Sequence, residues 1–282
     1  MDHTLAMLRY PFDFPKIPGR LLRRLNRFVV EAEVDGRKVK AHLPNPGRLW
    51  ELLLPGTALL LSPALSRGQL PYTVLACAKK GRYVLLHTQL TNKVIRGLID
   101  EERLPLFQEY RVSRAEPAWG KHRFDLLLQH RFSGAPFYLE IKSCTLFEKS
   151  TAMFPDAVTK RGAAHLLLLQ ELSREGLAAG CLFVVMSPQV KYFMPADHID
   201  LHFAETFVEV SGSVRLHAVA LGFDAEFTAV DSIETVAIPG SYLTKKPRDR
   251  GLYLLLVTLK QSRRLTLEDQ GETVLEKGYY LY

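Results

Sequence analysis

The sequence is poor in cysteine. Its 282 residues include three cysteines, Cys77, Cys144 and Cys181, and no Cys-x-x-Cys pair. A sparse, odd set of this kind argues against a disulfide framework and against a structural zinc site. No uncharged apolar run reaches the about 18 residues that span a bilayer, and the N-terminus lacks the basic and apolar regions of a signal peptide. We therefore expect a cytoplasmic protein without membrane contacts.

The composition is that of a globular protein with a hydrophobic core. Hydrophobic residues make up 47% of the chain and charged residues 24%, which is ordinary for a folded domain. The formal net charge is +7 and the isoelectric point is near 9.3. This excess favours a polyanionic partner such as nucleic acid, although many basic proteins bind no anion.

The first part of the chain contains short apolar runs spaced by about ten residues. Asp35-Gly36 is a typical hairpin turn between two of them. Five such strands fit a small OB-like barrel, which we assign to residues 1–87. The predicted strands are 28–34, 37–43, 57–62, 72–78 and 82–88.

The pattern changes after residue 88. A helix at 92–102 is followed by strands at 123–129 and 137–142, a helix from Asp156 to about Arg174, and a buried strand at 181–186. Asp156 is predicted to be the N-cap of the second helix. This order indicates an α/β domain over residues 88–220, and residues 221–282 form a C-terminal extension.

Three charged residues interrupt the apolar strands of the α/β domain. Glu140 and Lys142 lie two residues apart, so their side chains project from the same face. Asp125 lies on the preceding strand, where pairing of the two strands would bring it beside Glu140. Charged groups on such strands are costly unless they are exposed or paired. The simplest structural interpretation is therefore an ion pair between Lys142 and a carboxylate.

A functional interpretation is a metal site. Two adjacent carboxylates repel each other, and a divalent cation relieves that repulsion. Oxygen ligands favour Mg²⁺ or Mn²⁺ over zinc, so Asp125 and Glu140 are predicted to be metal ligands. The cation would polarise a phosphate oxygen and activate water, and Lys142 would orient that water. This pattern predicts a metal-dependent nuclease.

Several sequence blocks resemble a known family. They are Arg123-Phe-Asp-Leu, Tyr138-Leu-Glu-Ile-Lys-Ser-Cys-Thr145, Phe154-Pro-Asp-Ala-Val-Thr-Lys-Arg-Gly162 and, upstream, His42-Leu-Pro-Asn-Pro-Gly47. Together they resemble the sugar fermentation stimulation protein A (SfsA) family over about residues 18–220. The resemblance implies a mixed α/β chain, with an N-terminal OB-like nucleic-acid-binding barrel followed by a PD-(D/E)xK nuclease-like α/β domain. Asp125, Glu140 and Lys142 match the metal ligands and the lysine of that nuclease class.

The resemblance adds further candidate site residues. Arg161 and His165 lie one helical turn apart on one face, and the resemblance suggests that they hold a phosphate; a solvated helix face is the alternative. Glu116 matches a family glutamate and is a third candidate metal ligand, with a surface ion pair as the alternative. The family also has an acidic residue in the first helix, whereas the matching stretch from Lys93 to Gly97 contains no carboxylate.

The barrel sequence is strongly basic. Between Lys16 and Arg48 there are nine Lys or Arg residues against three acids, which is typical of sequence-independent phosphate binding. Phe28 and Tyr72 are candidate stacking platforms for bases, or core residues. His42 and Asn45 are expected to contact a phosphate or base, although Asn45 could instead hold its own proline-rich loop. The candidate nucleic-acid-binding residues are Arg20, Arg24, Arg27, Lys38, Lys40, His42, Asn45 and Arg48.

The extension contains two segments, 250–257 and 276–282, that resemble the opening strands of a DUF123 domain, which is related to GIY-YIG nucleases. The leading hypothesis for the whole chain is a nucleic-acid-binding protein with Mg²⁺- or Mn²⁺-dependent phosphodiesterase activity on DNA or RNA. The alternative is a nonspecific DNA-binding regulator of sugar catabolism with a weak or inactive nuclease site. Assembly into a homodimer is left open by the sequence.

Overall fold

The computed structural model describes residues 12, 14–64, 70–244, 267–269 and 272–275. The chain divides into two units, Met1–Arg250 and Gly251–Tyr282. In the second unit, the described strands β18 (Leu267–Asp269) and β19 (Glu272–Leu275) pair antiparallel. The two segments that resemble a DUF123 domain, 250–257 and 276–282, lie outside the described residues, so this resemblance stays a prediction.

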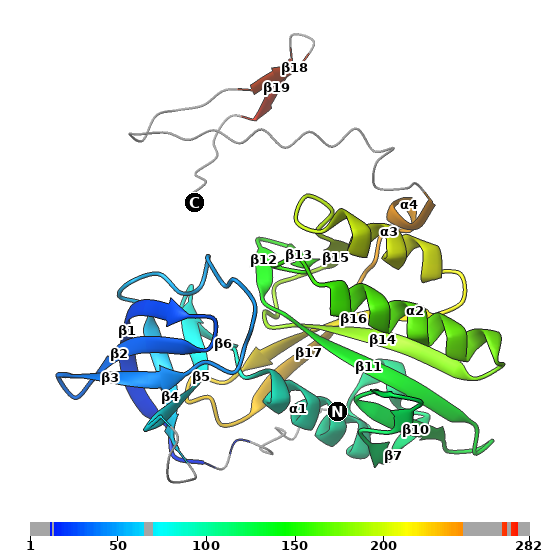
Figure 1. Cartoon of the computed structure of the whole chain (residues 1–282), viewed down its shortest axis with the longest axis horizontal. Coiled ribbons are helices and arrows are strands. Elements are labelled where there is room, and N and C mark those ends of the chain that lie inside the picture. The colour runs from blue at the N-terminus through cyan, green and yellow to red at the C-terminus, as the bar shows by residue number, and fades with distance from the viewer. Residues whose placement is uncertain (1–11, 13, 65–69, 245–266, 270–271, 276–282) are drawn as a thin grey trace, which may run out of the picture. The chain divides into compact units, whose positions relative to one another are not determined.

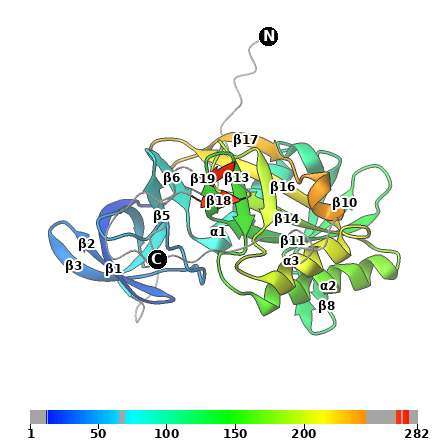
Figure 2. The same ribbon diagram turned by 90° about the horizontal axis from the view of Figure 1, so that it is seen from above.

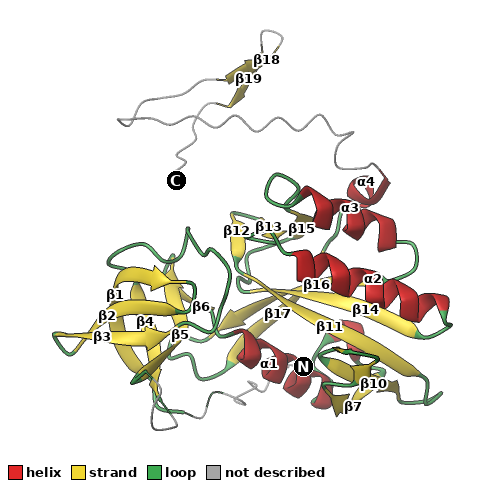
Figure 3. Ribbon diagram, viewed as in Figure 1, coloured by secondary structure: helices red, strands yellow, loops and turns green. Residues whose placement is uncertain are grey.

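The first unit contains a small closed barrel of five strands with a sixth strand beside it (Figure 3). The strands are β1 (Ile17–Asn26), β2 (Val29–Val34), β3 (Arg37–His42), β4 (Ala58–Pro63), β5 (Tyr72–Lys79) and β6 (Arg82–Leu85). They pair antiparallel in the order β3-β2-β1-β4-β5-β6, and β3 closes the barrel by pairing parallel with β5. This arrangement confirms the OB-like barrel expected from the strand spacing.

One turn of the barrel follows from local sequence, whereas its first strand does not. Asp35 and Gly36 have φ angles of 49° and 72°, which is the backbone that an Asp-Gly hairpin turn requires. Strand β1 was not predicted, because Pro18 and several arginines disrupt its apolar pattern. Leu21 nevertheless points into the barrel and is fully buried, so tertiary packing fixes this strand.

The second part of the first unit is a six-stranded sheet in the order β17-β16-β14-β11-β10-β7. Its strands are β7 (Tyr110–Ala115), β10 (Leu126–His130), β11 (Pro136–Cys144), β14 (Ala178–Val185), β16 (Arg215–Phe223) and β17 (Val230–Val236). The three central strands β11, β14 and β16 run parallel, and the outer strands are antiparallel to their neighbours. A parallel centre of this kind requires helices on both faces.

Helices cover both faces of this sheet. They are α1 (Thr88–Asp100), α2 (Lys160–Arg174), α3 (Leu201–Val210) and the short α4 (Gly240–Thr244). The smaller elements are η1 (Pro105–Phe107), β8 (Ala118–Trp119), β9 (His122–Arg123), β12 (Leu146–Glu148), β13 (Thr151–Phe154) and β15 (Tyr192–Pro195). The succession α1, β10, β11, α2, β14 matches the predicted order of helix, strand, strand, helix, strand.

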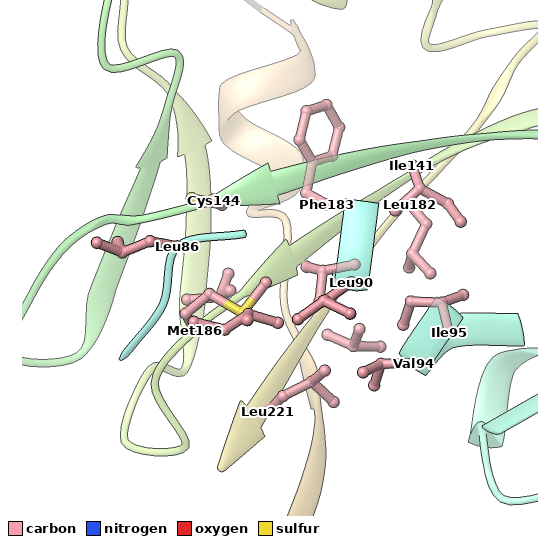
Figure 4. Packing of buried hydrophobic residues seen from close by; sticks show 14 of the residues in the cluster. Leu86, Leu90, Val94, Ile95, Ile141, Cys144, Leu182, Phe183, Met186 and Leu221 are labelled. Atoms are coloured by element: carbon pink, nitrogen blue, oxygen red, sulfur yellow. The ribbon is translucent and has the colours of Figure 1, made fainter. Parts of the chain in front are cut away.

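The two faces of the sheet carry separate hydrophobic layers. On one face, α1 packs Leu90 and Val94 toward Leu182 (Figure 4). Phe183, the next residue along β14, points to the opposite face, where its ring stacks on Phe193 with centroids 4.3 Å apart. Helices α2 and α3 lie side by side on that face (Figure 1, Figure 2). The central strands β11 and β14 are therefore held between two packed layers.

Several predicted boundaries differ from the structure. Helix α2 begins at Lys160, with Thr159 as its N-cap, so the assignment of Asp156 as the N-cap was wrong. Helix α1 begins at Thr88, four residues before the predicted start at residue 92. Strand β16 continues past residue 220, and β17 pairs with it, so the sheet includes residues that we had placed in the C-terminal extension.

The cysteines are free and buried, as expected of small core residues. Within the described part of the chain, no helix combines the length and the apolar character that a membrane crossing requires.

Gly180 allows a close approach in the centre of the sheet. A Cβ atom at this position would lie 2.7 Å from the Arg215 carbonyl oxygen and 2.7 Å from the Phe137 ring. The Arg215 carbonyl belongs to the neighbouring strand β16 and cannot move away from an added Cβ. We therefore predict that Gly180→Ala lowers the free energy of unfolding by about 1–3 kcal/mol, measured by urea denaturation. Gly212→Ala is the control, since a Cβ there meets nothing within 4 Å. Equal stability of the two variants would contradict the packing described for β14.

Candidate functional site

The sheet brings Asp125, Glu140 and Lys142 together. Leu126 on β10 pairs with Leu139 on β11, so Asp125, one residue earlier, falls opposite Glu140. The Asp125 Oδ2 atom accepts a hydrogen bond from the Ile141 amide at 2.7 Å. Lys142 Nζ lies 2.6 Å from Glu140 Oε1. The three residues predicted from the spacing of the sequence thus form one cluster.

The electrostatics of the two carboxylates differ. Glu140 is 4% exposed, and burial opposes its charge, but hydrogen bonding by His165 and the charge of Lys142 outweigh burial and hold its pKa below the ordinary value. Burial, followed by the nearby charge of Glu140, raises the pKa of Asp125 to about 6, despite the hydrogen bond from the Ile141 amide. The two neighbouring carboxylates therefore repel each other when both are ionised, and a bound cation would relieve this repulsion.

Helix α2 supplies Arg161 and His165 to the same cluster. Arg161 Nε lies 3.2 Å from His165 Nε2, and an arginine only donates, so this ring nitrogen accepts. The other nitrogen, Nδ1, then carries the proton and donates to Glu140 Oε1 at 2.5 Å. The predicted pair therefore acts as a unit, in which Arg161 fixes the tautomer of His165 and His165 fixes Glu140.

Asn92 is a site residue that the sequence analysis missed. It lies on α1, and its Nδ2 atom donates to Asp125 Oδ1 at 2.7 Å. The stretch from Lys93 to Gly97, where the family resemblance implies a carboxylate, contains none, and the residue of this helix that reaches Asp125 is the preceding asparagine. The available signal was a polar residue beside the apolar face of an amphipathic helix.

A cleft of about 570 Å³ opens above the cluster. Its floor contains Asp125, Glu140 and Lys142, and both the barrel and the α/β domain contribute walls. The cationic residues of the walls are Arg27 from the barrel and Lys160 and Arg161 from α2. Positive side chains that line a cleft attract phosphate groups.

The candidate nucleic-acid-binding residues of the barrel occupy different positions. Arg27 and Asn45 line the cleft. Arg20 lies on β1 and Lys38, Lys40 and His42 lie on β3, and none of these four is among the residues that line it. Arg48 follows the cleft-lining Gly47, and its guanidinium carbon lies 4.7 Å from the centroid of the Trp50 ring.

Asn45 and Arg24 are engaged with the backbone. The buried Asn45 side chain donates to the Leu86 carbonyl at 3.0 Å and accepts from the Gly47 amide at 2.9 Å, so it holds its own loop. Arg24 donates to the carbonyl oxygens of Arg27 at 2.9 Å and Gly47 at 2.7 Å. Arg24 therefore ties the β1–β2 turn to the loop that borders the cleft.

Asp156 joins the α/β domain to that loop of the barrel. Its Oδ2 atom accepts a hydrogen bond from the Leu49 amide at 3.2 Å. Burial raises the pKa of Asp156, and the charges of Arg24 and Arg48 partly offset this rise. A Cβ at position 47 would lie 2.3 Å from Asp156 Oδ2, which explains why the loop has a glycine there. The contact fixes the barrel wall of the cleft.

Glu116 does not join the cluster. Its side chain is 74% exposed and lies 3.8 Å from Arg123, which is the surface ion pair that the sequence left as an alternative. Among the described residues, no group of three His, Cys, Asp or Glu side chains is arranged to hold a metal ion. Two carboxylates suit Mg²⁺ or Mn²⁺, which keep several waters and use substrate oxygens, and do not suit zinc, which takes three or four protein ligands.

Comparisons with known proteins agree on one family. A family model described as "Sugar fermentation stimulation protein RE domain" matches residues 89–227, and one described as "SfsA N-terminal OB domain" matches residues 22–86. A sugar fermentation stimulation protein homolog from Pyrobaculum islandicum is 39% identical over 213 residues, covering 75% of this chain and 90% of the relative. The homolog from Clostridium tetani is 32% identical over 211 residues, with coverages of 74% and 91%.

A solved structure is also similar. It is described as "The structure of Pyrococcus Furiosus SfsA in complex with Ca2+", and it matches with a TM-score of 0.75 and 29% sequence identity. The match covers 83% of this chain and all of the other. The similarity therefore includes both the barrel and the α/β domain.

The raised pKa of Asp125 has a consequence for stability. Because its pKa of about 6 in the folded protein lies above the ordinary value of 3.8, this group favours folding below about pH 4, and that contribution is lost as the pH rises through 6. Asparagine does not ionise, so a variant with asparagine at this position does not lose stability in this way as the pH rises. We predict that Asp125→Asn, in EDTA, is more stable than the wild type by roughly 1–3 kcal/mol at pH 8 and that the two converge near pH 4.

Chemical denaturation at several pH values measures this difference. Glu116→Gln serves as the control, because an exposed carboxylate contributes little at either pH. An Asp125→Asn variant that is less stable than the wild type at pH 8 would show that the two carboxylates do not compete.

Proposed function

This chain belongs to the sugar fermentation stimulation protein (SfsA) family, and we propose that it is a metal-dependent phosphodiesterase that acts on nucleic acid. The observation that carries the proposal is the cluster of Asp125, Glu140 and Lys142 on the floor of a cleft with cationic walls. A cluster of opposed carboxylates with a lysine, open to a cleft that attracts phosphates, suits hydrolysis of a phosphodiester.

Asp125 and Glu140 would hold one Mg²⁺ or Mn²⁺ ion. When bound, such an ion supplies charge to a phosphate oxygen and lowers the pKa of a water molecule. The Ca²⁺ in the description of the Pyrococcus furiosus relative supports this part of the proposal, because Ca²⁺ and Mg²⁺ both take oxygen ligands. The raised pKa of Asp125 supports it as well. Burial and the charge of Glu140 disfavour the ionised carboxylate, and a nearby cation would favour it.

The chain's own residues position the reactants. Lys142, whose Nζ is 2.6 Å from Glu140 Oε1, orients the attacking water and offsets the negative charge that grows on the phosphate oxygens. Arg161 contributes a second positive charge, and His165 keeps Glu140 in place. In the hydrolysis, the water loses a proton as its oxygen bonds to phosphorus, the bond between phosphorus and the bridging ester oxygen breaks, and the leaving oxygen takes up a proton.

The barrel would hold the substrate through its phosphates. Arg27 lies on the cleft wall, and the net charge of +7 favours a polyanion. Contacts to phosphates carry no sequence information, so we propose DNA or RNA as the partner, bound largely without sequence preference. Such binding weakens steeply as the salt concentration rises.

A second candidate function is nucleic-acid binding without turnover. It is favoured by two features of the site: among the described residues no third His, Cys, Asp or Glu side chain completes a metal-ligand group, and Glu140 Oε1 already accepts from Lys142 and His165. In that case the protein acts as a nonspecific DNA-binding regulator with a weak or inactive nuclease site.

Cleavage assays separate the two candidates. We predict that the wild type cuts labelled oligonucleotides in Mn²⁺ and not in EDTA, and that Lys142→Ala reduces the rate at least 100-fold, because it removes charge stabilisation of the transition state, an effect of about 2.7–4 kcal/mol in comparable sites. Binding measured in EDTA should change little, since Lys142 lies on the floor and other cations form the walls.

Lys121→Ala is a matched control, because Lys121 is an exposed lysine outside the set of residues that line the cleft. This variant should retain the wild-type rate. Tight binding by the wild type without cleavage of any substrate in Mn²⁺ would refute the enzymatic proposal and leave the binding function.

A further inference from the structure

The exposed hydrophobic residues of this protein are concentrated on the barrel. Among the described residues, eight large hydrophobic side chains are exposed, and four of them lie in β1, in the β1–β2 turn or in the loop between β3 and β4. These four are Leu25, Phe28, Trp50 and Leu54. Phe28 is 47% exposed and Trp50 is 55% exposed. Exposed aromatic residues gathered on one part of a surface indicate a binding site.

From these rings we propose that the protein takes its nucleic acid as a single strand, whose bases stack on Phe28 and Trp50 while the backbone enters the cleft. This inference rests on the proposed function and specifies its substrate class. Tyr72, the other candidate stacking residue from the sequence, is packed against the hydrophobic core and takes no part.

The two rings belong to segments that border the cleft. Phe28 directly follows Arg27, and Trp50 lies three residues after Gly47; both Arg27 and Gly47 line the cleft. Arg24 donates to the carbonyl oxygens of Arg27 and Gly47, so its guanidinium holds the two segments together. A strand that leaves the cleft along the barrel would therefore pass these segments.

The chemistry around Trp50 suits a nucleotide. The Arg48 guanidinium carbon lies 4.7 Å from the centroid of the Trp50 ring, so a positive charge and an aromatic surface stand together. A phosphate requires the first and a base requires the second, and this combination is typical of proteins that bind single strands. Single-stranded binding through stacking is tolerant of sequence, because every base has a π-face.

The depth of the cleft argues against a duplex. The side chains of Glu140 and Lys142 are only 5% and 13% exposed, and the cleft volume of about 570 Å³ falls in the range of about 300–1,000 Å³ that holds one small ligand. A stiff duplex keeps its bases stacked inside and cannot pass a backbone into such a recess without opening. A flexible single strand can reach the floor and expose its bases to the rings.

Tryptophan fluorescence tests the inference directly. The chain has two tryptophans, Trp50 and Trp119, so Trp119→Phe leaves Trp50 as the only tryptophan reporter. In EDTA, which prevents turnover, we expect single-stranded DNA and RNA oligonucleotides to quench this emission and a blunt duplex of the same length to leave it unchanged. Fluorescence anisotropy of labelled oligonucleotides should show tighter binding of the single strands.

Substitutions then assign the stacking. Phe28→Ala and Trp50→Ala should each weaken single-strand binding roughly tenfold, whereas Trp50→Tyr should retain most of the affinity because it keeps an aromatic ring. Phe132→Ala is the matched control, since Phe132 is an aromatic residue that is 84% exposed and lies outside the cleft. Circular dichroism and the denaturation midpoint establish that each variant is folded.

The outcomes separate this inference from the proposed function. If duplex and single strand bind equally and quench Trp50 equally, or if Trp50→Ala binds as tightly as the wild type, the single-strand inference is overturned, while metal-dependent cleavage would still stand. If no nucleic acid binds at low salt, both the inference and the proposed function fail.

Discussion

The Asp125 and Glu140 carboxylates lie side by side in a buried sheet, and the rest of the site compensates their charge. The contact follows from strand register, because the pairing of Leu126 with Leu139 sets the two acids opposite each other. Glu140 stays ionised because of the residues that donate to it, whereas the pKa of Asp125 is raised to about 6. A divalent cation would favour the ionised form of both carboxylates and so relieve their mutual repulsion.

The barrel supplies one wall of the cleft that contains the two carboxylates. Asp156 accepts from the Leu49 amide of the barrel, and Arg24 ties the neighbouring backbone together through the Gly47 carbonyl. Asp156, which the sequence indicated as a helix N-cap, and Arg24, a candidate nucleic-acid-binding residue, therefore hold the barrel wall of the cleft in place. Arg27 adds a positive charge to this wall.

The sequence predicted the parts of the fold that have strong local signals. The Asp35-Gly36 hairpin and the apolar strands of the α/β domain could be read directly, because turn chemistry and periodicity are local. Strand β1 could not, since its pairing with β2 and β4 is decided by the closed barrel. The start of α2 was misplaced because a carboxylate at Asp156 resembles a cap, whereas its partner is a distant amide that only the tertiary structure brings near.

The site was predicted to a similar extent. Asp125, Glu140 and Lys142 follow from strand spacing, but Asn92 was found only through its contact with Asp125. Calorimetric titration of Mn²⁺ into the wild type and Glu140→Gln at neutral pH is the most direct test of whether the paired carboxylates form a divalent cation site. We expect one bound ion per chain in the wild type and loss of binding in the variant. Undiminished binding in Glu140→Gln, or no binding in the wild type, would contradict it.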